Sequence, residues 1–285
     1  MISDKIKKYL VQENKPLNEA VLVAAKDHFA YCFERQFMKD REHREGGIFP
    51  SGIKPCPRQM AYKFHNYEGE PFRSRTFFKF FLGDVAEIMM LYLAKLAGCD
   101  LDYNNEKVDI VMDDVTTYGR IDGLLKYEDK YYHVEFKSMA DFSFKSFQKF
   151  GISNTWGYLY QSNMYLASKQ MQDLKVTHTL FVGFNTNTGE IDEKLVAFDP
   201  HKDKEIRYRI KLLQASTKDK LPARFFELET EKKTGKQKLC VNCSYCAYKF
   251  YCWKVDDMGF ANYTNKPSFY VEDETVNGDG VNQCE

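Results

Sequence analysis

Residues 118–137 decide the fold, and they read Tyr118-Gly-Arg-Ile-Asp-Gly-Leu-Leu-Lys-Tyr-Glu-Asp-Lys-Tyr-Tyr-His-Val-Glu-Phe-Lys137. Apolar side chains recur over residues 121–125 and again over residues 131–136. Residues 128–130 between them are all charged, as is typical of a turn. The pattern predicts two strands joined by a polar turn.

The second predicted strand carries opposite charges on one face. Because successive strand residues point to opposite faces, Glu135 and Lys137 share one face and Phe136 lies on the other. Asp122, on the adjoining strand, can reach the same place. Two carboxylates beside a lysine suit a divalent metal, which prefers oxygen ligands. The same residues also fit an exposed strand face and an ordinary Asp-Gly turn, so the rest of the chain has to decide.

The composition sets outer bounds on the protein. The chain has 285 residues, 44% of them hydrophobic and 15% aromatic, which is ample for a large core. Its formal net charge is zero, so any affinity for nucleic acid must come from a local basic patch. The opening residues have mixed charge, and charged residues interrupt the most apolar stretch, residues 77–98. We therefore expect no secretory signal, no membrane span and a cytoplasmic protein, whose eight cysteines are not disulfides.

Helical spacing of apolar residues predicts two helices before the central stretch. The first covers residues 16–39 and is expected to pack on the core, with His28 and Cys32 as core residues. The second begins at Ser74 and ends at Gly98. It carries Glu87 among apolar neighbours, and a partly buried carboxylate needs a partner, either a functional one or a nearby cation.

Other segments complete the expected organisation. Residues 108–112 read as a strand that forms a meander with the two central strands. A helical region follows over residues 143–171, with a break near residues 151–154. Two further strands are expected at residues 176–184 and 191–198, and a charged helix follows at residues 200–217.

Four cysteines fall within thirteen residues, at Cys240, Cys243, Cys246 and Cys252. In a cytosolic protein such spacing indicates an iron–sulfur cluster or a zinc site, and spacing alone does not decide between them. Cys56, flanked by two prolines, is a further candidate ligand.

These motifs, taken in order, resemble one known family. They are similar to the RecB-like branch of the PD-(D/E)xK nucleases that carry a 4Fe–4S cluster, which includes the CRISPR-associated RecB-like exonucleases and the AddB nuclease domain. The resemblance covers about residues 55–255. It rests on these elements: Cys56 in Cys-Pro-Arg, Gly83 to Glu87, Asp122 in Gly119-Arg-Ile-Asp-Gly123, Glu135-Phe-Lys137, Gln161 to Tyr165, and Cys243, Cys246 and Cys252. Glu87 replaces the histidine of many relatives, and Cys240 is an extra thiol.

The resemblance implies an α/β fold with a restriction-endonuclease-like core, a central mixed β-sheet flanked by helices. The nuclease core would span residues 51–255. A helical extension would precede it at residues 1–50, and a tail would follow at residues 256–285, disordered after residue 267.

The family also implies a role for each motif. Glu87, Asp122 and Glu135 would hold Mg²⁺ or Mn²⁺ together with the Phe136 carbonyl, and Lys137 would orient or deprotonate the attacking water. Gln161 and Tyr165 would line the active site and contact DNA. A 4Fe–4S cluster, or Zn²⁺ as the alternative, would bind Cys56, Cys243, Cys246 and Cys252, with Cys240 as the alternative ligand. Candidates for phosphate contacts are Arg58, Arg120, Lys145 and Lys149. These four residues also fit the role of ordinary solvated surface charges.

We therefore expect a metal-dependent DNA exonuclease that acts on single strands or free ends in end processing, recombination, repair or replication. Without a helicase motif it would borrow a helicase, a recombinase or a single-strand-binding protein. A phage origin, and hence the host cytoplasm, is compatible with this organisation. The alternative is a non-catalytic iron–sulfur or zinc DNA-binding or assembly protein on a nuclease fold, which would be expected to lack a catalytic carboxylate or the lysine.

Overall fold

The computed structural model describes residues 1–15, 18–38, 47–72, 74–102, 107–154 and 157–253. The predicted tail at residues 256–285 therefore lies outside the described residues. Within them, no helix has the length and apolarity that a membrane span requires.

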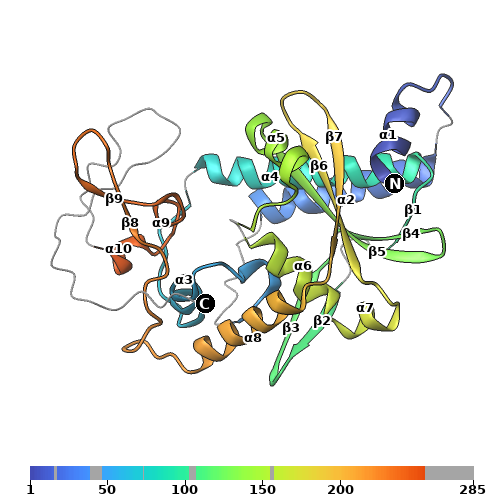
Figure 1. The fold of residues 1–285 in the computed structure, drawn as a ribbon. Coiled ribbons are helices and arrows are strands. Elements are labelled where there is room, and N and C mark those ends of the chain that lie inside the picture. The colour runs from blue at the N-terminus through green and yellow to red at the C-terminus, as the bar shows by residue number, and fades with distance from the viewer. Residues whose placement is uncertain (16–17, 39–46, 73, 103–106, 155–156, 254–285) are drawn as a thin grey trace.

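A five-stranded mixed sheet forms the centre of the molecule (Figure 1). Its strand order is β1-β4-β5-β6-β7, in which β5 and β6 run parallel and the other neighbours run antiparallel. The predicted strands that follow the central stretch are confirmed. The bounds are β1 Asp100–Asp102, β4 Gly123–Tyr127, β5 Lys130–Met139, β6 His178–Asn185 and β7 Ile191–Ala197.

Helices cover both faces of this sheet, and each face has its own apolar core. On one face, α1 (Ile2–Leu10) and α4 (Ser74–Leu96) pack against the apolar side of β5 and β6. On the other, α6 (Tyr158–Leu166), α8 (Pro200–Gln214) and α3 (Pro57–Phe64) enclose the second core. The predicted α/β architecture, a central mixed sheet flanked by helices, is confirmed.

A separate ribbon corrects the predicted meander. Strand β2 (Lys107–Met112) pairs only with β3 (Val115–Arg120), and this pair is not part of the central sheet. The chain leaves the ribbon after Arg120 and enters the central sheet at Gly123, so the predicted first strand is two strands with a break at Asp122. Asp122 therefore lies between two strands and not within one.

Shorter elements fill the remaining chain. The predicted helical region near residues 143–171 consists of α5 (Asp141–Phe150), α6 and α7 (Lys169–Asp173). A short 3-10 helix, η1, precedes α3. The C-terminal cysteines lie in and beside two short helices, α9 and α10, which follow a small ribbon of β8 and β9. The bounds are η1 Pro50–Gly52, β8 Leu228–Thr230, β9 Gln237–Leu239, α9 Val241–Ser244 and α10 Lys249–Cys252.

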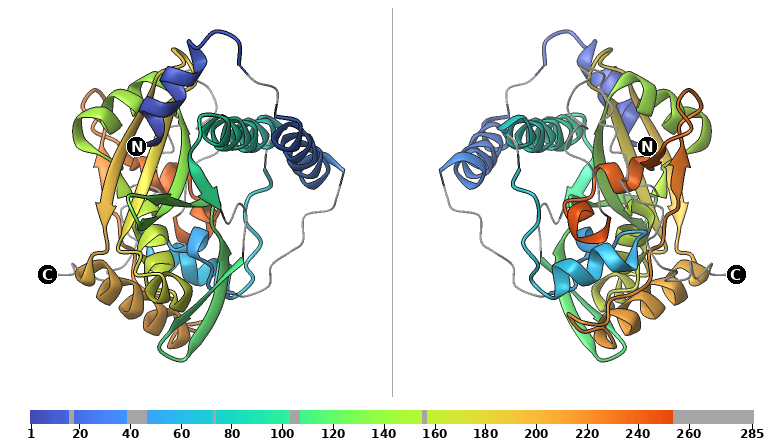
Figure 2. Two further views of the ribbon diagram at one scale, coloured as in Figure 1. Left: turned by 90° about the vertical axis from the view of Figure 1, so that its right-hand side faces the viewer. Right: turned by 90° about the vertical axis from the view of Figure 1, so that its left-hand side faces the viewer.

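Helix α2 (Glu19–Phe37) packs on the core in part, as predicted, through Val21, Ala25 and Cys32. It lies beside α4, outside the sheet, as two directions of view show (Figure 2). Several of its apolar side chains, such as Leu22 and Phe29, are exposed. His28 is only half-buried, so its predicted place in the core is wrong, whereas Cys32 is buried as predicted.

Candidate active site

Strand β5 places Glu135 and Lys137 on one face, as the alternation of the strand predicts. Lys137 Nζ donates a hydrogen bond of 2.5 Å to Glu135 Oε2. Glu135 is 1% exposed, while Val134 and Phe136 face the opposite core. A charged pair is therefore held at the end of an otherwise apolar strand.

Asp122 joins this pair because the chain breaks between β3 and β4. Asp122 lies between the two strands, and its Oδ2 accepts the backbone N–H of Phe136 at 2.8 Å. This hydrogen bond fixes the Asp122 carboxylate beside the backbone between Glu135 and Lys137.

Burial and crowding of like charges perturb the pKa values of the carboxylates. Burial, with the Glu135 charge adding to it, raises the pKa of Glu87 to about 7. Burial and then the charges of Glu135 and Glu87 raise the pKa of Asp122 well above its usual range. Burial would also raise the pKa of Glu135, but Lys137 and His133 outweigh it and lower that pKa to about 2.

Lys137 remains a cation in this setting. Burial would lower its pKa, but the Glu135 and Asp122 carboxylates outweigh burial and raise it. The site thus contains one firmly charged pair, Lys137 and Glu135, and two carboxyls that hold protons more tightly than in water.

The donor set fits a hard divalent cation. Three carboxyl groups repel one another electrostatically, and a cation would relieve this repulsion. Glu135 Oε1 is buried and has no hydrogen-bond partner among the described residues. In the conformation shown, however, no three described His, Cys, Asp or Glu side chains have metal-ligating spacing. The carboxylates would therefore have to rotate toward an ion to bind it.

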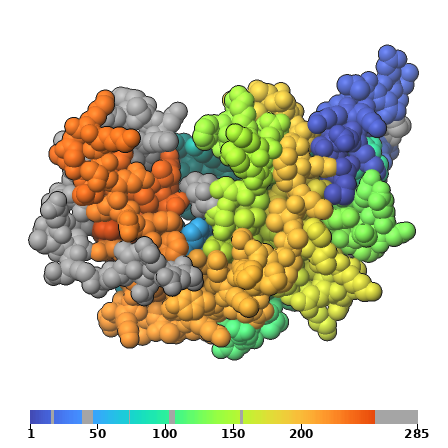
Figure 3. Space-filling model, viewed as in Figure 1, coloured from blue at the N-terminus to red at the C-terminus, as the bar shows by residue number. Residues whose placement is uncertain are grey.

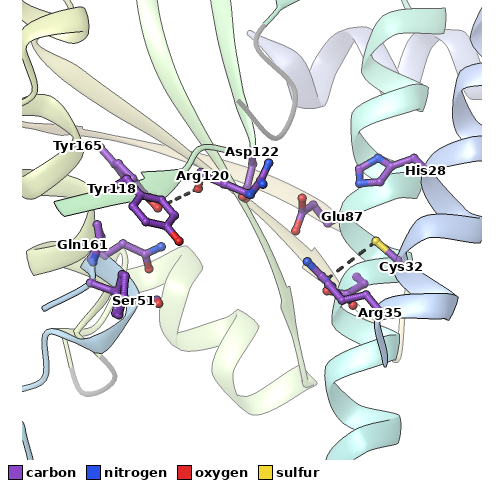
Figure 4. A pocket seen from close by; sticks show the side chains of 14 residues that line it. His28, Cys32, Arg35, Ser51, Glu87, Tyr118, Arg120, Asp122, Gln161 and Tyr165 are labelled. Carbon is purple, nitrogen blue, oxygen red and sulfur yellow. Dashed lines mark hydrogen bonds and ion pairs between the residues drawn. The ribbon is translucent and has the colours of Figure 1, made fainter. Parts of the chain in front are cut away.

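A cavity of about 220 Å³ opens beside these carboxyls. Figure 4 shows Glu87 and Asp122 on its walls, together with Gln161 and Tyr165 of α6, four residues to which the resemblance gave roles in one site. Arg120 also lines the cavity.

Helix α2 supplies a wall of this cavity that sequence reasoning missed. His28, Cys32 and Arg35 line it (Figure 4). Arg35 forms an ion pair of 2.8 Å with Asp84 of α4. The sequence hinted at this wall only through His28 and Cys32, whose polar side-chain atoms lie on an otherwise apolar stripe of the helix.

Tyr165 reaches the cavity because one neighbour has no side chain. A Cβ on Gly119 would come within 2.5 Å of the Tyr165 ring, and the Tyr165 hydroxyl donates to the Arg120 carbonyl at 2.8 Å. Gly119 thus allows α6 and the end of β3 to approach closely, just before the break at Asp122.

A series of buried polar side chains leads from α6 through β6 to Glu135. Ser162 Oγ donates to Thr179 Oγ1 at 2.7 Å, and Thr179 Oγ1 lies 2.9 Å from Nδ1 of the fully buried His133. His133 Nε2 in turn lies 3.5 Å from Glu135 Oε1. Sequence reasoning missed His133, although it shares the strand face of Glu135 and Lys137.

A second group of candidate ligands gathers at another place. Cys56, Cys243, Cys246 and Cys252 line one small pocket, and Cys240 is not among its lining residues. Arg58 lines this pocket too and donates to the Pro222 carbonyl at 3.1 Å. The predicted phosphate ligand Arg58 therefore lies at the cysteine pocket and does not line the carboxylate cavity.

The remaining predicted phosphate ligands lie on α5. Lys145 is paired with Asp141 at 2.8 Å, and Lys149 lies over the Phe150 ring at 4.9 Å from its centroid. Both lysines are exposed.

No protein-family model matches the chain, and no curated protein matches it in sequence. Among solved structures the chain is similar to a protein designated SSO0001, with a TM-score of 0.46 and 14% identity over 80% of this chain and 96% of that chain. It is also similar to the alkaline exonuclease LHK-Exo from Laribacter hongkongensis, with a TM-score of 0.42 and 14% identity over 67% of this chain and 91% of that chain. The complex of LHK-Exo with dAMP gives a TM-score of 0.42 and 13% identity, with the same coverage. At these TM-scores, function has to be argued from the chemistry of the site.

Proposed function

We propose that this chain is a metal-dependent DNA exonuclease of the RecB-like PD-(D/E)xK type, which hydrolyses phosphodiester bonds at DNA ends. The observation that carries the proposal is the buried Lys137–Glu135 pair beside two carboxyls with raised pKa values, Asp122 and Glu87. Strongly perturbed carboxyls beside a cavity are a mark of functional sites.

Each residue has a distinct role in the proposed reaction. Glu87, Asp122 and Glu135 would hold Mg²⁺ or Mn²⁺ with the Phe136 carbonyl, and such an ion supplies Lewis-acid activation of water and phosphate. Lys137 orients the attacking water and offsets the growing negative charge on the phosphate. Glu135 and Asp122 raise the pKa of Lys137 in the metal-free site, so the lysine is a cation there, and a cation suits this role.

We also propose that the four cysteines of the second pocket, Cys56, Cys243, Cys246 and Cys252, hold a 4Fe–4S cluster, with Zn²⁺ as the alternative. Thiol donors suit either. The support is that a cysteine from the start of the core shares this pocket with three from its end. No three described thiols have metal-ligating spacing, so loading would require them to move together.

Digestion of end-labelled oligonucleotides tests the activity directly. Single-stranded, blunt duplex and closed circular DNA are incubated with Mg²⁺ or Mn²⁺, and products are resolved by size. An exonuclease shortens linear strands stepwise and spares circles. No product from any substrate, with protein purified anaerobically, would contradict the proposal.

The raised pKa of Glu87 predicts a pH dependence of metal binding. A carboxyl binds a cation only after it loses its proton, so Mn²⁺ affinity should fall as the pH drops below about 7. Asp122 titrates in the same direction. Calorimetric titration below that pH, where Glu87 is mostly protonated, should therefore show proton release on binding, and Glu87→Gln should release up to about one proton fewer, since its amide has no ionisable proton. Equal proton release in both proteins would contradict the assignment.

The polar chain behind Glu135 predicts a role for His133. His133→Phe removes the nitrogen that faces Glu135 and should lower Mn²⁺ affinity by about 10- to 100-fold. His133→Gln, which can still donate a hydrogen bond, should retain more of it. Calorimetry on variants with matched melting curves measures the effect. Equal affinities in His133→Phe and the unaltered protein would exclude this role.

A further inference from the structure

A second cavity, of about 440 Å³, lies beside the candidate catalytic lysine. Lys137 lines it, together with residues of α5 and of the segment that follows α5. Glu87 and Asp122 line the first cavity and do not line this one. The backbone N–H of Phe136, the neighbour of Lys137, donates to Asp122 Oδ2 at 2.8 Å, so the second cavity adjoins the carboxylate site through Lys137.

Helix α5 forms a firm wall for this second cavity. Phe144 and Phe147 anchor the helix in the protein interior. A Cβ on Gly183 of β6 would come within 2.8 Å of the Phe147 ring, so the helix packs directly on the sheet. The surface is hollowed beside α5 (Figure 3).

The lining combines three kinds of group that suit a nucleotide chain. Lys137 contributes a positive charge, and Ser143 and Ser146 contribute hydroxyl groups along α5. Phe142 contributes an aromatic ring that is 86% exposed, and Tyr158 a second ring, 5.1 Å from Lys137 Nζ. A ring so exposed contributes little burial to the fold, so its face beside the cavity is available to a ligand.

We propose that this α5 groove holds an unpaired DNA strand next to the scissile phosphate, with a base stacked on Phe142. The inference rests on the proposed function, because it takes the Lys137–Glu135 pair as the place of cleavage. Hydroxyl groups and lysines meet phosphates and sugars, and an aromatic face stacks on any base. The cavity volume is within the range of small-ligand sites and suits one or two nucleotide units.

The same chemistry selects for unpaired DNA. Inside a duplex each base is already stacked on its neighbours, so Phe142 would find no open base face there. Lys149, and Lys145 with its partner Asp141, lie exposed on α5, and the lysine charges complement the negative charge of a DNA strand.

The chain offers a matched control for Phe142. Phe150 lies on the same helix and is 75% exposed, but it does not line the cavity. Fluorescence anisotropy measures the binding of a labelled oligothymidylate, with Ca²⁺ present to prevent turnover. Phe142→Ala should weaken this binding by about 5- to 150-fold, and Phe142→Trp should restore it. Phe150→Ala should leave both oligothymidylate binding and cleavage unchanged.

Three outcomes would overturn the inference: an unchanged affinity in Phe142→Ala, an equal loss in Phe150→Ala, or an equal loss on a blunt duplex. Hydrolysis of bis(4-nitrophenyl) phosphate and of DNA by the unaltered protein with Mn²⁺ reports separately on the proposed function. If the protein cleaves DNA but oligothymidylate binding does not depend on Phe142, only the proposal of the α5 groove is rejected. If the protein cleaves neither substrate but oligothymidylate binding still depends on Phe142, the α5 groove remains a single-strand binding site and the proposed nuclease activity is rejected.

Discussion

Replacing Lys137 with alanine is expected to lower the rate of DNA cleavage by about 100- to 1,000-fold, or to below detection. In the proposed mechanism Lys137 acts on the water and the phosphate; it donates a hydrogen bond to Glu135 and is not one of the proposed metal ligands. Mn²⁺ and DNA affinity should therefore be largely retained. Glu135→Ala should instead weaken Mn²⁺ binding as well as cleavage, because it removes a proposed ligand.

The two variants separate chemistry from binding. Single-turnover cleavage and calorimetric Mn²⁺ titration are measured on each, with melting curves as a check that the fold persists. Lys130→Ala, at the exposed start of the same strand, serves as the control and should cleave normally. Normal turnover in Lys137→Ala would remove the Glu-x-Lys strand from the active site.

Replacing Cys56 with serine is expected to remove the iron from protein purified anaerobically and to lower the thermal midpoint by on the order of 10 °C. Cys56 and Cys243 are 187 positions apart in the chain, yet they line the same pocket. A cluster bound there would tie the start of the core to its end, so its binding energy would stabilise the whole core.

Cys240→Ser is the matched control, since Cys240 belongs to the same sequence cluster but does not line the pocket. It should keep both the iron and the midpoint. Iron and sulfide analysis, with differential scanning calorimetry, decides between the two sites. A cluster that persists without Cys56 and is lost without Cys240 would contradict the assignment, and zinc in place of iron would favour the alternative metal.

Local patterns sufficed for the parts of the site that lie within one element. The alternation of a strand places Glu135 and Lys137 on one face whatever surrounds it, and the predicted pair is present at 2.5 Å. Likewise, the apolar run after Ser74 predicted α4 and its partly buried Glu87.

Other features depend on partners far away in the sequence. The break at Asp122 arises because β3 pairs with β2 while β4 pairs with β1 and β5, and no local signal reports that change of partner. The stripe of α2 was read as core, but periodicity shows only that a face is apolar and not what covers it. His133 escaped notice because its partner Thr179 lies on β6.

The cysteine pocket also has a consequence for the order in which the protein matures. A ribosome that has made Cys56 must add all the residues up to Cys252 before the pocket can close, which takes roughly 10 to 40 s at typical rates of synthesis. During that interval Lys137 and the two strands of its site have already emerged. The strand that carries Lys137 is therefore synthesised before the cysteine pocket can be completed, because Cys252 follows it in the chain.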